Sequence, residues 1–154
     1  LSIPDDAIIA GIAGASWPAR LQHLSHGALV ELPPPGTTLL LDGGHNPAAA
    51  EALAAALAGK RVGVAIGMLA NKDLEGFLRP LAPLITELVA VPIPGHEHHA
   101  PAAAVETAAA MGVAASVAPD LIAALKTLSS DTILIGGSLY LAGVALEQNG
   151  TPPI

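Results

Sequence analysis

Residues 38–66 read TLLLDGGHNPAAAEALAAALAGKRVGVAI, and this stretch decides the fold. The short apolar run 38–41 predicts a strand that ends at an aspartate. An asparagine before a proline is a good helix start, so Asn46 is the expected N-cap of a helix over 47–57. The apolar run 61–66 predicts a second strand. Two strands joined by a helix form a βαβ unit with parallel strands.

The same alternation continues towards the C-terminus. Further helices are predicted over 73–81, 101–111, 120–128 and 139–147, and further strands over 84–91, 114–117 and 132–135. Because the strands are continuous apolar runs, the sheet must be covered on both faces. The sequence therefore predicts an α/β domain of three layers, with a mostly parallel open sheet flanked by helices.

Outside this alternation the pattern is less regular. The predicted features are a short helix over 7–15 after Asp5 and Asp6, a break at 17–20, a hairpin that pairs 21–24 with 28–32 across 25–27, and a tail over 148–154. Between the hairpin and the first parallel strand, Pro33-Pro34-Pro35-Gly36 is a stiff connector that no regular element tolerates.

Composition limits the classes of function. The chain has 154 residues, which fits one domain over 1–154, and its 12% of charged residues excludes a disordered tail. With no cysteine, a disulfide framework and a thiolate metal site are excluded. The net charge is −7, and the six Lys and Arg residues are scattered, which argues against nucleic acid as a partner.

No membrane segment is predicted. No apolar run reaches the roughly 18 residues that a membrane helix needs, and no basic segment precedes an apolar stretch at the N-terminus, as a signal peptide would require. A cytoplasmic location is therefore expected. The chain begins with Leu1 and not with Met, which predicts that it is part of something longer.

Ligands of open α/β sheets bind beyond the carboxyl ends of the strands, so the strand-to-helix turns are the expected place for chemistry. The first turn is Leu41-Asp42-Gly43-Gly44-His45-Asn46-Pro47. Its glycines permit close approach of a ligand to the backbone, and the free N–H groups after Asn46 favour an anion. Asp42 and His45 are expected to project into the crevice, since helix capping explains neither side chain. For Asn46 and Pro47, a capped helix start without a ligand is the alternative.

Two further turns follow the same logic. In Gly136-Gly137-Ser138-Leu139-Tyr140, Ser138 stands at a cap position, and a capped helix alone explains it equally well. Tyr140 is expected in the core. In the turn 67–73, Asp73 is the expected N-cap of the next helix, and Lys72 is either a solvated lysine or a phosphate contact.

A phosphate loop is not predicted, because no turn matches G-x-G-x-x-G or G-x-x-x-x-G-K-[ST]. Arg20 follows a Trp-Pro break and either clamps a phosphate through two parallel hydrogen bonds or forms a surface ion pair. His96-Glu97-His98-His99 lies in a loop flanked by Pro and Gly, where helical ligand spacing is not available. A solvated loop is favoured there over a metal site.

Taken together, four segments resemble folylpolyglutamate synthase / dihydrofolate synthase. Trp17-Pro18-Ala19-Arg20-Leu21-Gln22 corresponds to the family motif W-P-G-R-[LF]-Q, and Asp42-Gly43-Gly44-His45-Asn46-Pro47 corresponds to D-G-A-H-N-P. Gly67-Met68 through Lys72-Asp73 corresponds to G-M-x-x-x-K-D, and Gly137-Ser138-Leu139-Tyr140 corresponds to G-S-L-Y. All four occur in the family's order. Ala19 replaces the usual glycine, and the segment between Arg20 and Asp42 is longer than in many members.

The resemblance implies the C-terminal domain of an enzyme with the Mur ligase fold, whose upstream ATP-binding domain is absent from these residues. Such ligases use ATP to activate a carboxylate of dihydropteroate or of a folate's terminal glutamate as an acyl phosphate, which the amine of L-glutamate then attacks. This is the chemistry of folate biosynthesis and polyglutamylation. The upstream domain would supply the phosphate loop, the Mg²⁺ ligands and most of the pterin pocket.

The resemblance also implies roles for six residues. Arg20, Asp42 and Asn46 would lie on the nucleotide side, with Arg20 against the ATP phosphates and Asp42 hydrogen-bonded to the ribose. His45 and Ser138 would hold the incoming glutamate, and Lys72 is a weaker candidate for the same anionic crevice.

Two other interpretations are open. One is a stand-alone α/β binding module without chemistry, because a fold by itself does not define a function. The other is the C-terminal domain of a cell-wall Mur ligase, against which the G-S-L-Y and W-P-A-R segments count. The isolated domain is expected to be inactive, and the choice between dihydrofolate synthesis and polyglutamate extension is left open.

Overall fold

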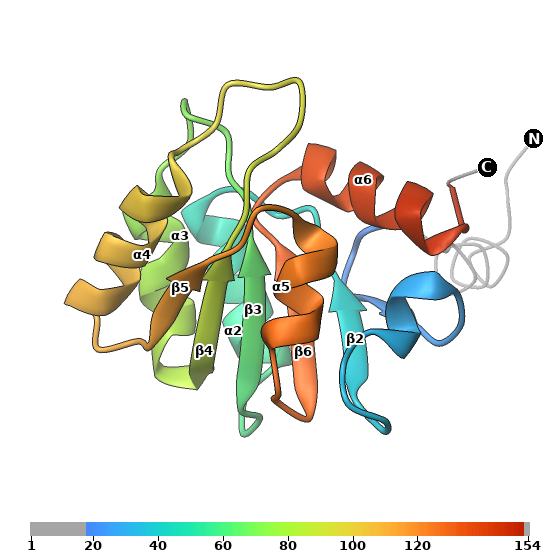
Figure 1. Ribbon diagram of the computed structural model, residues 1–154. Helices are drawn as coiled ribbons and strands as arrows, with labels where there is room; N and C mark the ends of the chain where they lie inside the picture. Colours follow the sequence, from blue (N-terminus) through green and yellow to red (C-terminus); the bar gives the residue numbers. More distant parts are fainter. Residues whose placement is uncertain (1–17, 153–154) are drawn as a thin grey trace, which may run out of the picture.

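The computed structural model describes residues 18–152, and in them a single sheet has the strand order β1-β2-β6-β3-β4-β5 (Figure 1). β1 is antiparallel to β2, and the other neighbouring strands are parallel. The strands are β1 (Gln22–Leu24), β2 (Thr38–Leu41), β3 (Val62–Ile66), β4 (Ile85–Ala90), β5 (Ala115–Val117) and β6 (Thr132–Gly136).

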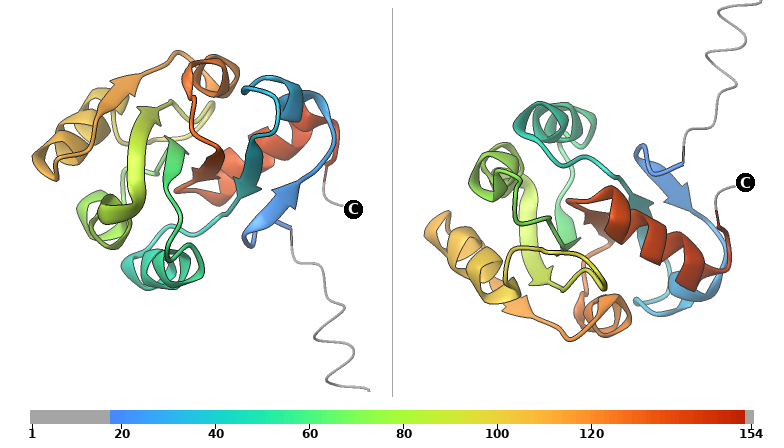
Figure 2. Two further views of the ribbon diagram at one scale, coloured as in Figure 1. Left: turned by 90° about the horizontal axis from the view of Figure 1, so that it is seen from below. Right: turned by 90° about the horizontal axis from the view of Figure 1, so that it is seen from above.

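Helices cover both faces of this sheet (Figure 2). One face carries α2 (Pro47–Ala56), α3 (Leu74–Leu81) and α4 (Pro101–Ala110), and the other carries α5 (Leu121–Thr127), α6 (Leu139–Asn149) and the 3-10 turn η1 (Ala28–Glu31). A second 3-10 turn, η2 (Ala82–Leu84), leads into β4. The predicted three-layer α/β fold is confirmed, and its helices and parallel strands match the predicted ranges to within two residues at each end.

Two apolar cores fill the spaces between the layers. β6 contributes to both, since Ile133 and Ile135 pack towards α5 and α6 while Leu134 packs towards α2, α3 and α4. Successive side chains of a strand point to opposite faces, so a sheet buried on both sides must be apolar at every position. Among residues 18–152, Phe77 of α3 is the one aromatic residue in these cores, and the other core side chains are aliphatic apart from Met68.

The predicted hairpin over 21–32 is wrong. β1 pairs instead with β2, in the register Gln22 opposite Leu41, and the second half of the supposed hairpin is η1. The reason is a contact from the far end of the chain. The buried amide of Asn149 accepts a hydrogen bond from the Leu29 N–H (3.0 Å) and donates one to the His26 carbonyl (2.9 Å), which ties this segment to α6.

The end of the last helix also differs from the prediction. α6 runs to Asn149, two residues beyond the predicted end, and Gly150 closes it with a left-handed φ of 76°. Gly150 is thus the C-cap rather than part of a tail. The predicted helix over 7–15, Trp17, and the last two residues of the predicted tail lie outside the described residues.

Glu87 in β4 links the sheet to the loop before β6. Its Oε1 accepts hydrogen bonds from the Ser129 N–H (2.7 Å), the Ser130 N–H (2.8 Å) and the Ser130 hydroxyl (2.7 Å). Burial raises the pKa of Glu87, but these hydrogen bonds together outweigh it, so the net pKa lies below the ordinary value of 4.5. A carboxyl group whose pKa is lowered by folding stabilises the folded state above its unfolded pKa.

We therefore expect Glu87→Gln to lower the free energy of unfolding at neutral pH. The difference in free energy of unfolding between the variant and the natural sequence should disappear as the pH falls below 4.5 and through the lower pKa of the folded state. Glu87 is then protonated in both the folded and the unfolded state. Urea unfolding of both proteins measures this difference in free energy. The measurements run from about pH 7 to about pH 3, a range that includes the titration of a carboxyl group. A difference in free energy of unfolding that stays constant across this pH range would contradict the prediction.

None of the helices in residues 18–152 has both the length and the apolar character that crossing a bilayer requires.

Candidate functional site

The carboxyl ends of the parallel strands meet at one edge of the sheet, at the top of Figure 1. The turns after β2, β3, β4 and β6 all lie there, because parallel strands point the same way. Asn46, Asp73 and Ser138 cap the helices that follow three of these turns, each by accepting a hydrogen bond from a backbone N–H of the first turn. The predicted caps at these positions are confirmed.

A first cavity of about 200 Å³, here called the Ser138 pocket, opens at this edge. It is lined by His45, Leu69, Asn71, Lys72, Ser138, Leu139 and Tyr140. The structure thus brings together His45, Lys72 and Ser138, which come from three separate turns. The ammonium of Lys72 and the hydroxyl of Ser138 can both donate hydrogen bonds, so this pocket suits a carboxylate or another small anion.

His45 is oriented from inside its own turn. Its Nδ1 lies 3.1 Å from the Gly43 carbonyl, and since a carbonyl only accepts, Nδ1 must carry the proton. Nε2 is then the acceptor nitrogen of the neutral ring and can accept a hydrogen bond from an N–H group of a ligand. Ser138 is 2% exposed, and its Oγ accepts from the Tyr140 N–H at 3.0 Å. Its hydroxyl proton is therefore not used by the cap and can be donated to a ligand.

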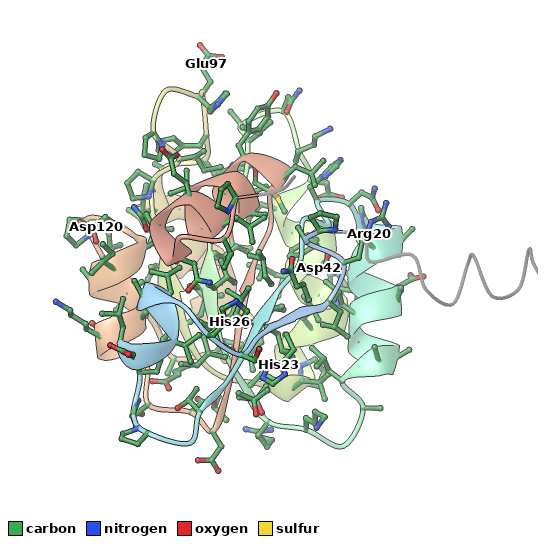
Figure 3. All side chains as sticks on the ribbon, turned by 90° about the vertical axis from the view of Figure 1, so that its right-hand side faces the viewer. Arg20, His23, His26, Asp42, Glu97 and Asp120 are labelled. Atoms are coloured by element: carbon green, nitrogen blue, oxygen red, sulfur yellow. The ribbon has the colours of Figure 1, made fainter. Side chains whose placement is uncertain are left out.

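A second cavity of about 260 Å³, here called the Arg20 pocket, contains the other two main candidates. It is lined by Arg20, Leu21, Asp42, Gly44, Ala49, Ala52, Leu53 and Ala56. Figure 3 shows Arg20 and Asp42 close together, beside the upper end of α2. The candidates other than Asn46 therefore divide between the two pockets, with Arg20 and Asp42 in one and His45, Lys72 and Ser138 in the other. This is the grouping that the resemblance implies.

Asp42 is buried, at 7% exposed, and both of its carboxylate oxygens accept backbone hydrogen bonds. Oδ2 accepts from the Leu21 N–H and Oδ1 from the Gly44 N–H, each at 2.7 Å. Arg20 is exposed, and the one ion pair among residues 18–152 joins Arg79 to Glu75. The surface ion pair that sequence allowed for Arg20 is therefore not formed with any described residue.

Asn46 is not brought into either pocket. Its Oδ1 accepts from the Ala49 N–H at 2.9 Å, so its side chain serves as the cap of α2, although it follows directly on His45.

The histidine-rich loop is packed rather than simply solvated. His99 bonds to the neighbouring turn twice, through its N–H to the Met68 carbonyl (2.9 Å) and through Nε2 to the Lys72 carbonyl (2.8 Å). His98 forms a β-bridge with Leu69. Within residues 18–152 no three His, Cys, Asp or Glu side chains gather as metal ligands would. The loop thus braces the turn that carries Lys72.

The prediction that Tyr140 lies in the core is wrong. Tyr140 is 49% exposed, because it starts α6 at the rim of the Ser138 pocket and faces the loop instead of the sheet. Its ring centroid lies 3.8 Å from that of His96. The sequence held no signal for this pair, since the two residues are far apart in the chain and the loop has no periodic pattern.

Many nucleotide-binding enzymes share a three-layer α/β fold that binds its ligand at the carboxyl edge of the sheet. The chain matches the family "Mur ligase, glutamate ligase domain" over residues 28–139 and belongs to that family. The resemblance seen in the four sequence segments is confirmed.

Two curated or solved folylpolyglutamate synthases are among the proteins that the chain resembles. The chain is 32% identical over 140 residues to folylpolyglutamate synthase of Lacticaseibacillus casei, which covers 89% of this chain and 31% of that protein. Mycobacterium tuberculosis folylpolyglutamate synthase complexed with ADP and AMPPCP has a TM-score of 0.81 at 27% identity, over 99% of this chain and 36% of the other.

A third match is bifunctional folylpolyglutamate synthase/dihydrofolate synthase from Yersinia pestis complexed with AMPPNP and a Mn ion, with a TM-score of 0.75 at 26% identity, over 96% of this chain and 35% of the other. The chain spans about a third of the length of the curated relatives it matches.

Proposed function

We propose that this chain is the glutamate ligase domain of an ATP-dependent ligase that adds L-glutamate to dihydropteroate or to a folate. The observation that carries the proposal is the pair of pockets at one sheet edge, in a chain of this family. The Ser138 pocket offers donors for the carboxylate of an amino acid, and the Arg20 pocket offers a guanidinium for phosphates.

The proposed reaction has two steps. A carboxylate oxygen of the acceptor attacks the γ-phosphorus of ATP, the bond from that phosphorus to the β-phosphate oxygen breaks, and ADP leaves. The amine of L-glutamate then attacks the acyl carbon, loses a proton, and inorganic phosphate leaves, so that an amide remains. Negative charge gathers on the transferred phosphoryl group, and a guanidinium can neutralise it through two parallel hydrogen bonds.

We assign Arg20 to the phosphates and Asp42 to the ribose side of the same nucleotide, since both line the Arg20 pocket. Asn46 contributes to this corner through the N-terminus of α2, whose first N–H groups it helps to orient as the cap. His45 and Ser138 hold the incoming glutamate, with Lys72 as a further cation on the same pocket. Each of these roles is a proposal from placement and chemistry.

We further propose that residues 1–154 form one domain and that the phosphate loop and the Mg²⁺ ligands come from an ATP-binding domain of the complete protein. Bound Mg²⁺ would help to neutralise the phosphates. Alone, the domain would lack half of the nucleotide site and would not catalyse the reaction.

The test is a ligation assay with the complete protein. ATP, Mg²⁺ and L-glutamate are supplied with dihydropteroate in one series and with a reduced folate in the other, and products are identified by mass spectrometry. We expect an amide product that carries one more glutamate, in at least one series, and no product from the 154-residue chain alone. Absence of an amide product in both series would overturn the proposal and favour a binding module.

A further inference from the structure

We propose that Asp42 is a positioning residue for Arg20. Its carboxylate holds the backbone turn that aims the guanidinium into the Arg20 pocket, and it contributes to nucleotide binding chiefly by that route. The inference rests on the proposed function in one respect, namely that Arg20 is the phosphate ligand.

The turn that carries Arg20 has an unusual backbone. Ala19 has a φ of 56° and Leu21 a φ of 44°, and these are the two non-glycine residues with positive φ in the part of the chain that the structure describes. A side chain with a Cβ rarely adopts this left-handed conformation, least of all a bulky one such as leucine. Such residues persist only where surrounding contacts hold them.

Three hydrogen bonds hold this turn. The Leu21 N–H donates to Asp42 Oδ2 (2.7 Å), the Gly43 N–H donates to the Ala19 carbonyl (2.8 Å), and the Ala19 N–H donates to Gln22 Oε1 (3.0 Å). The bond from Leu21 to Asp42 is charge-assisted, which makes it stronger than the other two.

Asp42 also fixes the neighbouring turn through Oδ1, which accepts from the Gly44 N–H at 2.7 Å. One buried carboxylate therefore joins the Arg20 turn to the turn that carries His45. Since both oxygens accept hydrogen bonds from backbone N–H groups, the orientation of Asp42 is set by the protein. That is the property a positioning residue needs.

Arg20 itself has little else to orient it. Its side chain is exposed, and it forms no ion pair with a carboxylate in residues 18–152, Asp42 included, although both line the same pocket. The direction of the guanidinium therefore depends on the backbone of the turn. Release of that turn from Asp42 would let Leu21 relax and would move Arg20 away from the phosphates.

A double-mutant cycle separates this role from direct contact with the nucleotide. The dissociation constant for ADP is measured by calorimetry on the complete protein for the natural sequence, Arg20→Ala, Asp42→Asn and the double variant. We expect each single change to weaken ADP binding at least about tenfold, as the loss of a charge-assisted contact does. The double variant should bind no more than about twofold more weakly than Arg20→Ala, because residues that act through one contact are not additive.

A second variant keeps the test independent of how well Asp42→Asn folds. Gln22→Ala removes the acceptor of the Ala19 N–H, and Gln22 does not line the Arg20 pocket. Gln22→Ala should weaken ADP binding when it is the only change. In a protein that already carries Arg20→Ala, it should have no further effect on ADP binding. His23→Ala, an exposed change in the same strand, is the matched control and should leave ADP binding unchanged.

The outcomes are distinct. If the effects of Asp42→Asn and Arg20→Ala multiply, and Gln22→Ala leaves ADP binding unchanged, Asp42 acts by direct contact and the inference is overturned while the proposed function stands. If Arg20→Ala leaves ADP binding unchanged, Arg20 does not hold the two phosphates that ADP carries and the inference fails, whereas the ligation assay decides the proposed function.

Discussion

Arg20→Ala in the complete protein is expected to lower the turnover of the proposed glutamate ligation by at least about a hundredfold, the usual cost of losing a group that stabilises transition-state charge. Arg20 lines a pocket at the carboxyl edge and carries a guanidinium that no described carboxylate neutralises. Its charge is therefore available to the phosphoryl group, which becomes most negative as it is transferred. Steady-state kinetics with saturating ATP, L-glutamate and acceptor measures the effect.

Arg79→Ala is the matched control. Arg79 is an exposed arginine of α3 whose side chain pairs with Glu75, four residues earlier on the same helix. Exposed pairs of this kind contribute about 0.5 kcal/mol to stability, and Arg79 lines neither the Ser138 nor the Arg20 pocket, so turnover should stay within about twofold of normal. Near-normal turnover of Arg20→Ala would rule out its assigned role.

Gly137→Ala is expected to lower the free energy of unfolding by about 3 kcal/mol, the sum of backbone strain and a steric clash. Gly137 has a φ of 98°, and an added Cβ would lie 2.9 Å from the Gly67 carbonyl oxygen. That oxygen belongs to the backbone of the adjacent turn and cannot move alone. Because Ser138 is the next residue, the same change should also distort the Ser138 pocket. Urea unfolding of the 154-residue chain measures the loss.

Gly143→Ala in α6 is the control for this prediction. Nothing lies within 4 Å of the Cβ that it would add, and its φ is not positive. Alanine is the better helix former, so this variant should be more stable by about 0.5 to 1 kcal/mol. If Gly137→Ala proved as stable as Gly143→Ala, the tight approach of the β6 turn to the β3 turn would be refuted.

The parts of the fold that could be predicted from sequence are those that local chemistry determines. The strand 38–41 and the caps Asn46, Asp73 and Ser138 depend on neighbouring residues only, and the structure has each of them in place. The meeting of His45, Lys72 and Ser138 was also predictable in outline, because the turns of parallel strands gather at one edge.

The parts that could not be predicted depend on distant residues. The hairpin prediction failed because Asn149 binds Leu29 from 120 positions away, and no pattern within 21–32 carries that information. The packing of His99 on the Lys72 turn and of His96 on Tyr140 is likewise non-local. Asp42 shows the same limit within the site, because its bond to Leu21 is visible only once β1 is known to lie beside β2.

The central claim is that this chain belongs to a ligase that activates a carboxylate with ATP and passes the acyl group to L-glutamate. A label of heavy oxygen in the acceptor carboxylate tests it most directly, with the complete protein, ATP, Mg²⁺ and L-glutamate. An acyl phosphate transfers one carboxylate oxygen to phosphorus, so the account predicts one labelled oxygen in each inorganic phosphate released, together with ADP and the amide. Phosphate that forms without the label, or without an amide, would contradict the account.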